Sequence, residues 1–156
     1  MPLFKTINVS PTTQILIWKV TESFDELRAK VILKPKTEKR LNGMKSEMHQ
    51  RAFLSVRMLI QEVGISDFDL HYDEFGKPYL DDHRYVSITH SHNFASIIIS
   101  SETVGIDMEM LREKIISKDE TVVVNCTGHT FPVEKHVLGD QWAVDVHLSK
   151  DQSPAP

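Results

Sequence analysis

The chain has 156 residues, 40% of them hydrophobic and 26% charged, which is typical of one soluble domain with a single core. No apolar stretch approaches the roughly 20 residues needed to span a membrane, and the first residues lack the apolar segment of a signal peptide. The single cysteine, Cys126, excludes an internal disulfide and is typical of a reducing compartment. We therefore expect a cytoplasmic protein that does not act on membranes.

The net charge of -4 is unevenly distributed along the chain. Residues 1–60 carry 11 Lys and Arg against 5 Asp and Glu, whereas residues 61–156 carry 7 against 17. The basic part includes five cations, which are Lys34, Lys36, Lys39, Arg40 and Lys45. Such a group attracts an acidic partner or a phosphorylated ligand, or is an ordinary solvated surface. Nucleic acid is not expected, because no nucleic-acid-binding motif accompanies these residues.

Three elements are predicted in the first 64 residues. The apolar run 14–20 predicts a strand, and Ser23 with Glu26 fits a capping box that opens a short helix. Apolar residues then recur at helical spacing from Met48 to Val63, and Gly64 is placed to end this long helix.

Short strands are predicted in the middle of the chain, at residues 68–72, 85–89, 95–100 and 103–108. Residues 73–76 predict a turn. Sharp turns at 91–93 and 101–102 favour an antiparallel meander. The expected fold class is α+β, with an antiparallel sheet packed against one long helix.

The run Val-Gly-Ile-Asp-Met-Glu at 104–109 places two acids two residues apart in a predicted strand. Side chains at i and i+2 of a strand point to the same face, so Asp107 and Glu109 are expected to lie side by side. Two close carboxylates are unfavourable unless a cation joins them, and Mg²⁺ prefers oxygen ligands. The pair therefore predicts a magnesium site, and the alternative is the acidic face of a half-exposed strand.

Three short motifs follow one another along the chain: Gly76-Lys77-Pro78, Ile88-Thr89-His90-Ser91 and Gly105-Ile106-Asp107-Met108-Glu109. Their order and spacing resemble the 4'-phosphopantetheinyl transferases of the surfactin-synthetase-activating type, over about residues 45–110. Those enzymes transfer phosphopantetheine from coenzyme A to a serine of an acyl or peptidyl carrier protein. The family's usual Ser before the histidine is Thr89 here.

The resemblance implies a role for each matching residue. Asp107 and Glu109 would hold Mg²⁺ against the pyrophosphate of coenzyme A, and His90 would contact a phosphate, with the 3'-phosphate favoured. Lys77 would add a cation near the nucleotide, and Ser91 would donate its hydroxyl or its N–H. The ordinary alternatives are a hydrogen-bonded histidine at a strand end and a solvated lysine in a turn.

Two arginines of the predicted long helix are further candidates for binding a phosphate of coenzyme A. Arg51 and Arg57 are six residues apart and therefore lie on different faces of the helix. We expect one of them to reach a phosphate, since Arg suits bidentate contacts. The apolar context of Arg57 matches the family pattern better than that of Arg51.

Full-length members of the resembled family have two similar halves with the active site between them. Residues 1–117 are similar to the first half, whereas residues 118–156 lack the Trp-x-x-Lys-Glu-x-x-x-Lys helix of the second. That helix supplies the general base, for which Glu113 and Glu120 are the nearest local substitutes. No catalytic residue is assigned, and transfer is expected to be impaired.

The C-terminal segment 118–156 predicts two strands, at 121–124 and 142–148, and a disordered tail at 151–156. The alternative to an enzyme is a non-catalytic half-domain that binds coenzyme A or a partner. Self-association is also expected, because the face meant for a second half would be apolar.

Other site types remain open. His90 and His92, with Asp107 or Glu109, form a possible zinc-binding set. Cys126-x-x-His129 has ligand-like spacing but no second pair. Besides an enzyme and a non-catalytic half-domain, a third possibility for the whole chain is an unrelated α+β binding domain whose motifs match those of the transferases by chance.

Overall fold

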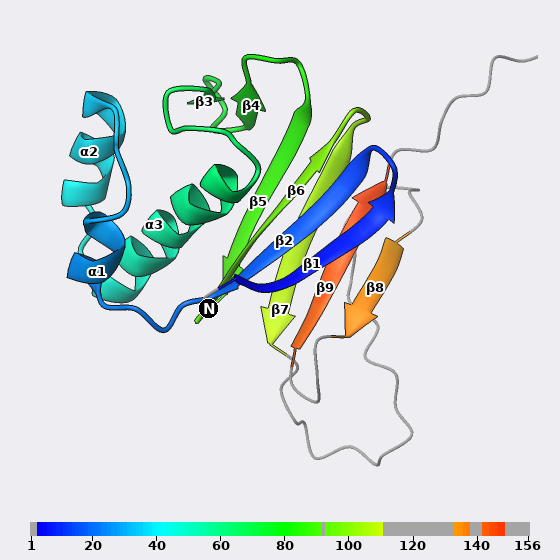
Figure 1. Cartoon of the computed structure of the whole chain (residues 1–156), viewed down its shortest axis with the longest axis horizontal. Coiled ribbons are helices and arrows are strands. Elements are labelled where there is room, and N and C mark those ends of the chain that lie inside the picture. Colours follow the sequence, from blue (N-terminus) through cyan, green and yellow to red (C-terminus); the bar gives the residue numbers. More distant parts are fainter. Residues whose placement is uncertain (1–2, 92, 111–132, 138–141, 149–156) are drawn as a thin grey trace, which may run out of the picture.

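The computed structural model describes residues 3–91, 93–110, 133–137 and 142–148, and for residues from 109 onward it describes the backbone alone. Within that part, helices cover one face of a four-stranded antiparallel sheet, and a three-stranded sheet lies against the other face (Figure 1). The predicted class is confirmed, because the chain is α+β with a long helix packed on an antiparallel sheet.

The main sheet has the strand order β1-β2-β6-β5, and every neighbouring pair is antiparallel. Its strands are β1 Leu3–Ser10, β2 Thr13–Lys19, β5 Tyr85–Ser91 and β6 Phe94–Ser100. A small hairpin pairs β3 Leu70–Tyr72 with β4 Pro78–Leu80. A third sheet has the order β7-β9-β8, with β7 Val104–Met110, β8 Val133–Val137 and β9 Trp142–Leu148.

The three helices are α1 Phe24–Arg28, α2 Pro35–Asn42 and α3 Glu47–Glu62. The predicted capping box of α1 is confirmed, since the Ser23 hydroxyl accepts from the Glu26 N–H and the Glu26 carboxylate accepts from the Ser23 N–H. Gly64 follows α3 with φ +74°, a conformation that favours glycine and ends the helix as predicted.

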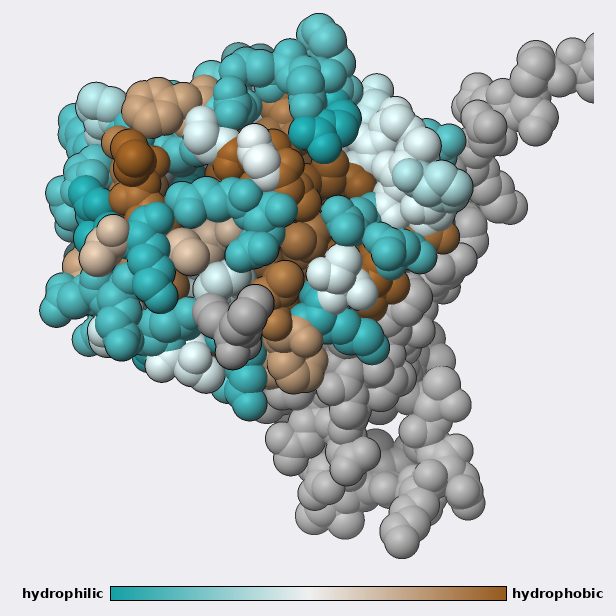
Figure 2. All heavy atoms as spheres, in the orientation of Figure 1, coloured by the Kyte–Doolittle hydropathy of each residue, from teal (hydrophilic) through white to brown (hydrophobic). Residues whose placement is uncertain are grey.

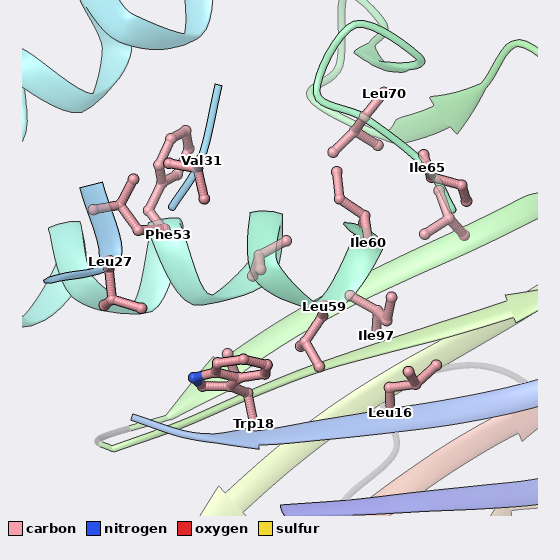
Figure 3. Close-up of a cluster of buried hydrophobic side chains, with 14 of the residues drawn as sticks. Leu16, Trp18, Leu27, Val31, Phe53, Leu59, Ile60, Ile65, Leu70 and Ile97 are labelled. Carbon is pink, nitrogen blue, oxygen red and sulfur yellow. The ribbon is translucent and has the colours of Figure 1, made fainter. Parts of the chain in front are cut away.

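Alternation along the central strands divides the core into two layers. Leu16 and Trp18 of β2 face the helices and pack with Leu59 of α3 (Figure 3). Ile15 and Ile17 face the other way, in a cluster with Ile98 of β6 and with Ile106 and Met108 of β7. Burying each of these side chains stabilises the fold by about 1.5–3 kcal/mol.

The surface reflects this layering. Polar residues cover most of the helical side, whereas apolar residues reach the surface in a strip over the junction of α3 with the sheet (Figure 2). No helix in the described ranges is both long and apolar enough to cross a membrane.

The structure differs from the sequence prediction in two ways. The meander ends at β6, because β7 packs across the face of the main sheet and pairs with β9 instead. Elements β1, α2, β4 and β8 were not predicted, whereas the strand at 142–148 is confirmed as β9. The segments 121–124 and 151–156 lie outside the described residues.

The pairing of β9 with β7 bears on the proposed boundary after residue 117. Asp107 lies opposite Asp145, so a strand of the C-terminal segment adjoins the strand of the acidic motif. The division into 1–117 and 118–156 stays a prediction.

Candidate functional site

His90 lies near the end of β5 and faces the helices. Val86 belongs to the helix-side core and Ile88 packs against it, so His90, two residues further along the strand, shares their face. Its ring centroid is 6.0 Å from that of His49, in the first turn of α3. His90 is exposed by area, yet partial desolvation lowers its pKa below the usual 6.5, and the charge of His49 lowers it further.

Two hydrogen bonds fasten β7 to β5. The Ile106 N–H donates to the Ser87 hydroxyl and the Met108 N–H donates to the Thr89 hydroxyl, both at 3.2 Å. These bonds place the strand of His90 beside the strand of Asp107. The side chains of His90 and Asp107 nevertheless point in different directions. His90 faces the helices, whereas Asp107 is exposed and lies between Ile106 and Met108, which are buried against the main sheet.

The magnesium prediction concerns Asp107 and Glu109. The structure describes the Asp107 side chain as exposed, whereas the Glu109 side chain lies outside the described part. Among the described side chains, no group of three or more His, Cys, Asp or Glu could hold a metal ion. An exposed carboxylate such as that of Asp107 can bind a Mg²⁺ ion whose other ligands are water molecules and phosphate oxygens of a ligand.

Lys77 follows Gly76, whose φ of +80° forms the turn between β3 and β4. The Lys77 N–H donates to the Asp73 carboxylate at 2.8 Å, which fixes the backbone of this turn. The exposed Lys77 side chain lines a pocket of about 410 Å³ that also includes Tyr79 and Tyr85. Lys77 and His90 therefore belong to different parts of the surface: the hairpin turn and the α3 side of β5.

A cationic pocket of about 370 Å³ lies between α2, α3 and the β3–β4 hairpin. Its lining combines four cations with aromatic rings and comprises Lys34, Lys36, Thr37, Arg40, Arg57, His71, Tyr72 and Tyr79. The Arg40 guanidinium lies 4.9 Å from the centroid of the Tyr72 ring and 5.6 Å from that of Phe53. Neither Arg40 nor Lys36 forms an ion pair with a described carboxylate, so both charges are available to a ligand.

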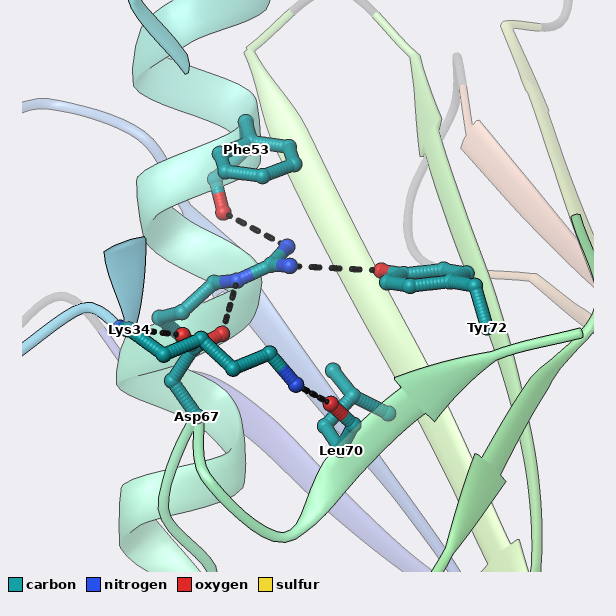
Figure 4. Close-up of polar contacts among 6 residues, drawn as sticks. Lys34, Phe53, Asp67, Leu70 and Tyr72 are labelled. Atoms are coloured by element: carbon teal, nitrogen blue, oxygen red, sulfur yellow. Dashed lines mark hydrogen bonds and ion pairs between the residues drawn. The ribbon is translucent and has the colours of Figure 1, made fainter. Parts of the chain in front are cut away.

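Arg57 is the buried cation of this pocket, with only 2% of its area exposed. Its Nε lies 3.2 Å from Asp67 Oδ1, and its other two nitrogens donate to the Tyr72 hydroxyl and the Phe53 carbonyl (Figure 4). Asp67 also accepts from the Lys34 N–H, and Lys34 Nζ donates to the Leu70 carbonyl. This network joins α2, α3 and β3. The contacts of Arg57 therefore stabilise the elements that form the pocket.

Two further predicted residues have clear positions. Arg51 is half-buried, and its Nε donates to the Glu22 carbonyl at 2.7 Å, which joins α3 to the segment that precedes α1. Ser91 is half-buried at the end of β5, next to His90. His92, Glu113, Glu120, Cys126 and His129 lie outside the described residues.

Sequence reasoning named Lys36 and Arg40 as part of a basic group but not as a site. Their spacing of four residues puts both on one face of a helix, and Pro35 is well suited to a first helical position. This spacing indicates a shared face only within a helix, and α2 was not predicted.

No protein-family model matches this chain, and no curated protein matches it as a relative.

Proposed function

We propose that this chain binds coenzyme A and belongs functionally with enzymes that transfer its phosphopantetheine arm to a serine of an acyl or peptidyl carrier protein. The observation that carries the proposal is the cationic pocket lined by Lys36, Arg40 and Arg57. Arg40 and Lys36, which have no ion-pair partner among the described residues, lie beside aromatic rings and suit a ligand with phosphates and a planar base. The order and spacing of the motifs around Lys77, His90 and Asp107 support the same ligand through their resemblance to the transferases, although these side chains lie on different parts of the surface.

The chemistry of transfer explains which groups the chain would need. The serine oxygen forms a bond to phosphorus, the pyrophosphate bond breaks, and the adenosine part leaves with its phosphates. Negative charge on phosphate oxygens must therefore be stabilised, and fixed cations do this with little reorganisation. Lys36, Arg40 and Lys77 are exposed cations that would bind and orient the nucleotide end.

Asp107 and Glu109 would hold Mg²⁺, which neutralises phosphate charge when bound. The β7–β5 hydrogen bonds would keep Asp107 near the His90 strand. A general base is also required to accept the serine proton, and none is assigned among the described residues. The alternative function is a half-domain that binds coenzyme A or a protein partner without transfer.

The binding step is tested by titrating coenzyme A into wild type, Arg40→Gln and Lys5→Gln. Loss of a charge-assisted contact at Arg40 is expected to cost about 1.5–3 kcal/mol of binding free energy. Lys5, an exposed cation of β1 that does not line the pocket, serves as the charge control. Absence of coenzyme A binding, or equal loss in both variants, would contradict the proposal.

The transfer step needs a separate measurement. Apo carrier protein is incubated with the chain, coenzyme A and Mg²⁺, and the mass of the carrier is followed. A gain equal to phosphopantetheine supports the enzyme, whereas binding without any mass gain favours the non-catalytic alternative.

A further inference from the structure

His49 and His90 face one another, and no described residue compensates their charges. Their ring centroids are 6.0 Å apart with an interplanar angle of 57°, and both residues are exposed. Neither imidazole has a hydrogen-bonding or ionic partner among the described residues. His71, by contrast, has an acidic partner: the distance from its Nε2 atom to an Asp81 carboxylate oxygen is 2.8 Å.

Two imidazoles this close repel each other when both are protonated, and no described acid offsets their charges. An anionic group between them would accept a hydrogen bond from each ring and remove the repulsion. Glu47 does not serve that purpose, because a residue two positions before His49 lies on the opposite side of the helix. The rings lie at the first turn of α3, whose dipole also favours negative charge.

We propose that His49 and His90 hold one phosphate group of the ligand between them, so that His49 is a second phosphate-binding residue. This inference rests on the proposed function, since coenzyme A supplies the phosphate. His49 belongs to none of the three motifs, and its place opposite His90 arises from the packing of α3 on β5.

A phosphate is favoured over a transition metal as the occupant. Zinc sites use three or four His, Cys, Asp or Glu ligands, and the described residues offer no such group of three. The two rings alone would leave a metal ion mostly water-coordinated. They suit a phosphate better, because its several oxygens accept from two donors on different elements.

The test compares coenzyme A and dephospho-coenzyme A binding to wild type, His49→Gln and Met48→Gln. Met48 is the exposed neighbour of His49 and controls for changes in the first turn of α3. His49→Gln is expected to weaken coenzyme A binding about tenfold or more, and Met48→Gln to leave it within about twofold. Loss confined to coenzyme A identifies the 3'-phosphate as the bound group, and equal loss for both ligands identifies the pyrophosphate.

The inference is overturned if His49→Gln binds both ligands like wild type while Arg40→Gln binds them weakly. That outcome would leave the proposed function intact. Inorganic phosphate provides a second readout, because it should shift the NMR signals of both imidazoles in the wild type. Micromolar zinc binding lost in His49→Gln, with no response to phosphate, would make the pair a metal site instead.

Discussion

The backbone N–H of Met108 donates to the hydroxyl of Thr89 at 3.2 Å, and this bond joins the strand of the acidic pair to the strand of His90. The resembled family usually has Ser at this position, and either hydroxyl can accept the bond. Thr89 therefore supplies the same kind of acceptor as the Ser of the resembled pattern.

Thr89→Val keeps the shape of the side chain but removes the acceptor, so the Met108 N–H loses its partner. We expect a loss of about 1–3 kcal/mol in the free energy of unfolding, measured by urea denaturation. Thr89→Ser should stay within about 0.5 kcal/mol of wild type. If Val and Ser behave alike, the hydroxyl does not hold β7.

Magnesium binding is the second expectation. Asp107 is exposed and offers few ligands alone, so Mg²⁺ affinity should be weak, about millimolar, and should strengthen when coenzyme A supplies phosphate oxygens. In Asp107→Asn, coenzyme A should raise the Mg²⁺ affinity much less, because the amide carries no charge. The measurement is a Mg²⁺ titration with and without coenzyme A. An equal response in both proteins would remove Asp107 from the site.

Much of the fold could be predicted because the signal is local. The apolar positions of α3 repeat at helical spacing, and the capping box at Ser23 involves four adjacent residues. Strand β1 was missed because it is an edge strand with many exposed residues, and α2 because it buries only Thr37 and Leu41. Neither element has enough apolar residues to show its period.

The site was harder to predict because its geometry depends on distant contacts. The motifs predicted roles for His90 and Asp107, but the burial of Arg57 depends on Asp67, and the cationic pocket depends on α2. His49 has no motif at all, and only the packing of α3 brings it to His90. The position of β7 likewise depends on which strand it pairs with, which local propensity does not determine.

The acid response of His90 is the third expectation. Desolvation and then His49 lower its pKa below 6.5, so the unfolded chain binds more protons than the folded chain as the pH falls. The stability due to neutral His90 is therefore complete above pH 6.5 and is lost as the pH falls through the folded pKa. NMR titration should show the pKa of His90 rising toward 6.5 in His49→Gln. An unchanged pKa would show that His49 exerts no charge effect.

The buried pair of Arg57 and Asp67 gives the last expectation. Each side chain is almost fully buried, so replacing one leaves the other charge without compensation. Arg57→Met is expected to cost about 3–5 kcal/mol in the free energy of unfolding. Adding Asp67→Asn should recover part of this loss, because the amide still accepts from the Lys34 N–H and no longer carries a charge.

The comparison of single and double variants by urea denaturation measures this coupling. Coenzyme A titration on the same proteins separates stability from the site. If Arg57 acts mainly by holding the pocket walls, the folded double variant should bind coenzyme A within about tenfold of wild type, because the exposed Arg40 and Lys36 remain. A much larger loss in a well-folded protein would mean that Arg57 itself contacts the phosphate, as the family pattern implies. An Arg57→Met variant as stable as wild type would instead show that the Arg57–Asp67 ion pair does not hold α3 to the pocket.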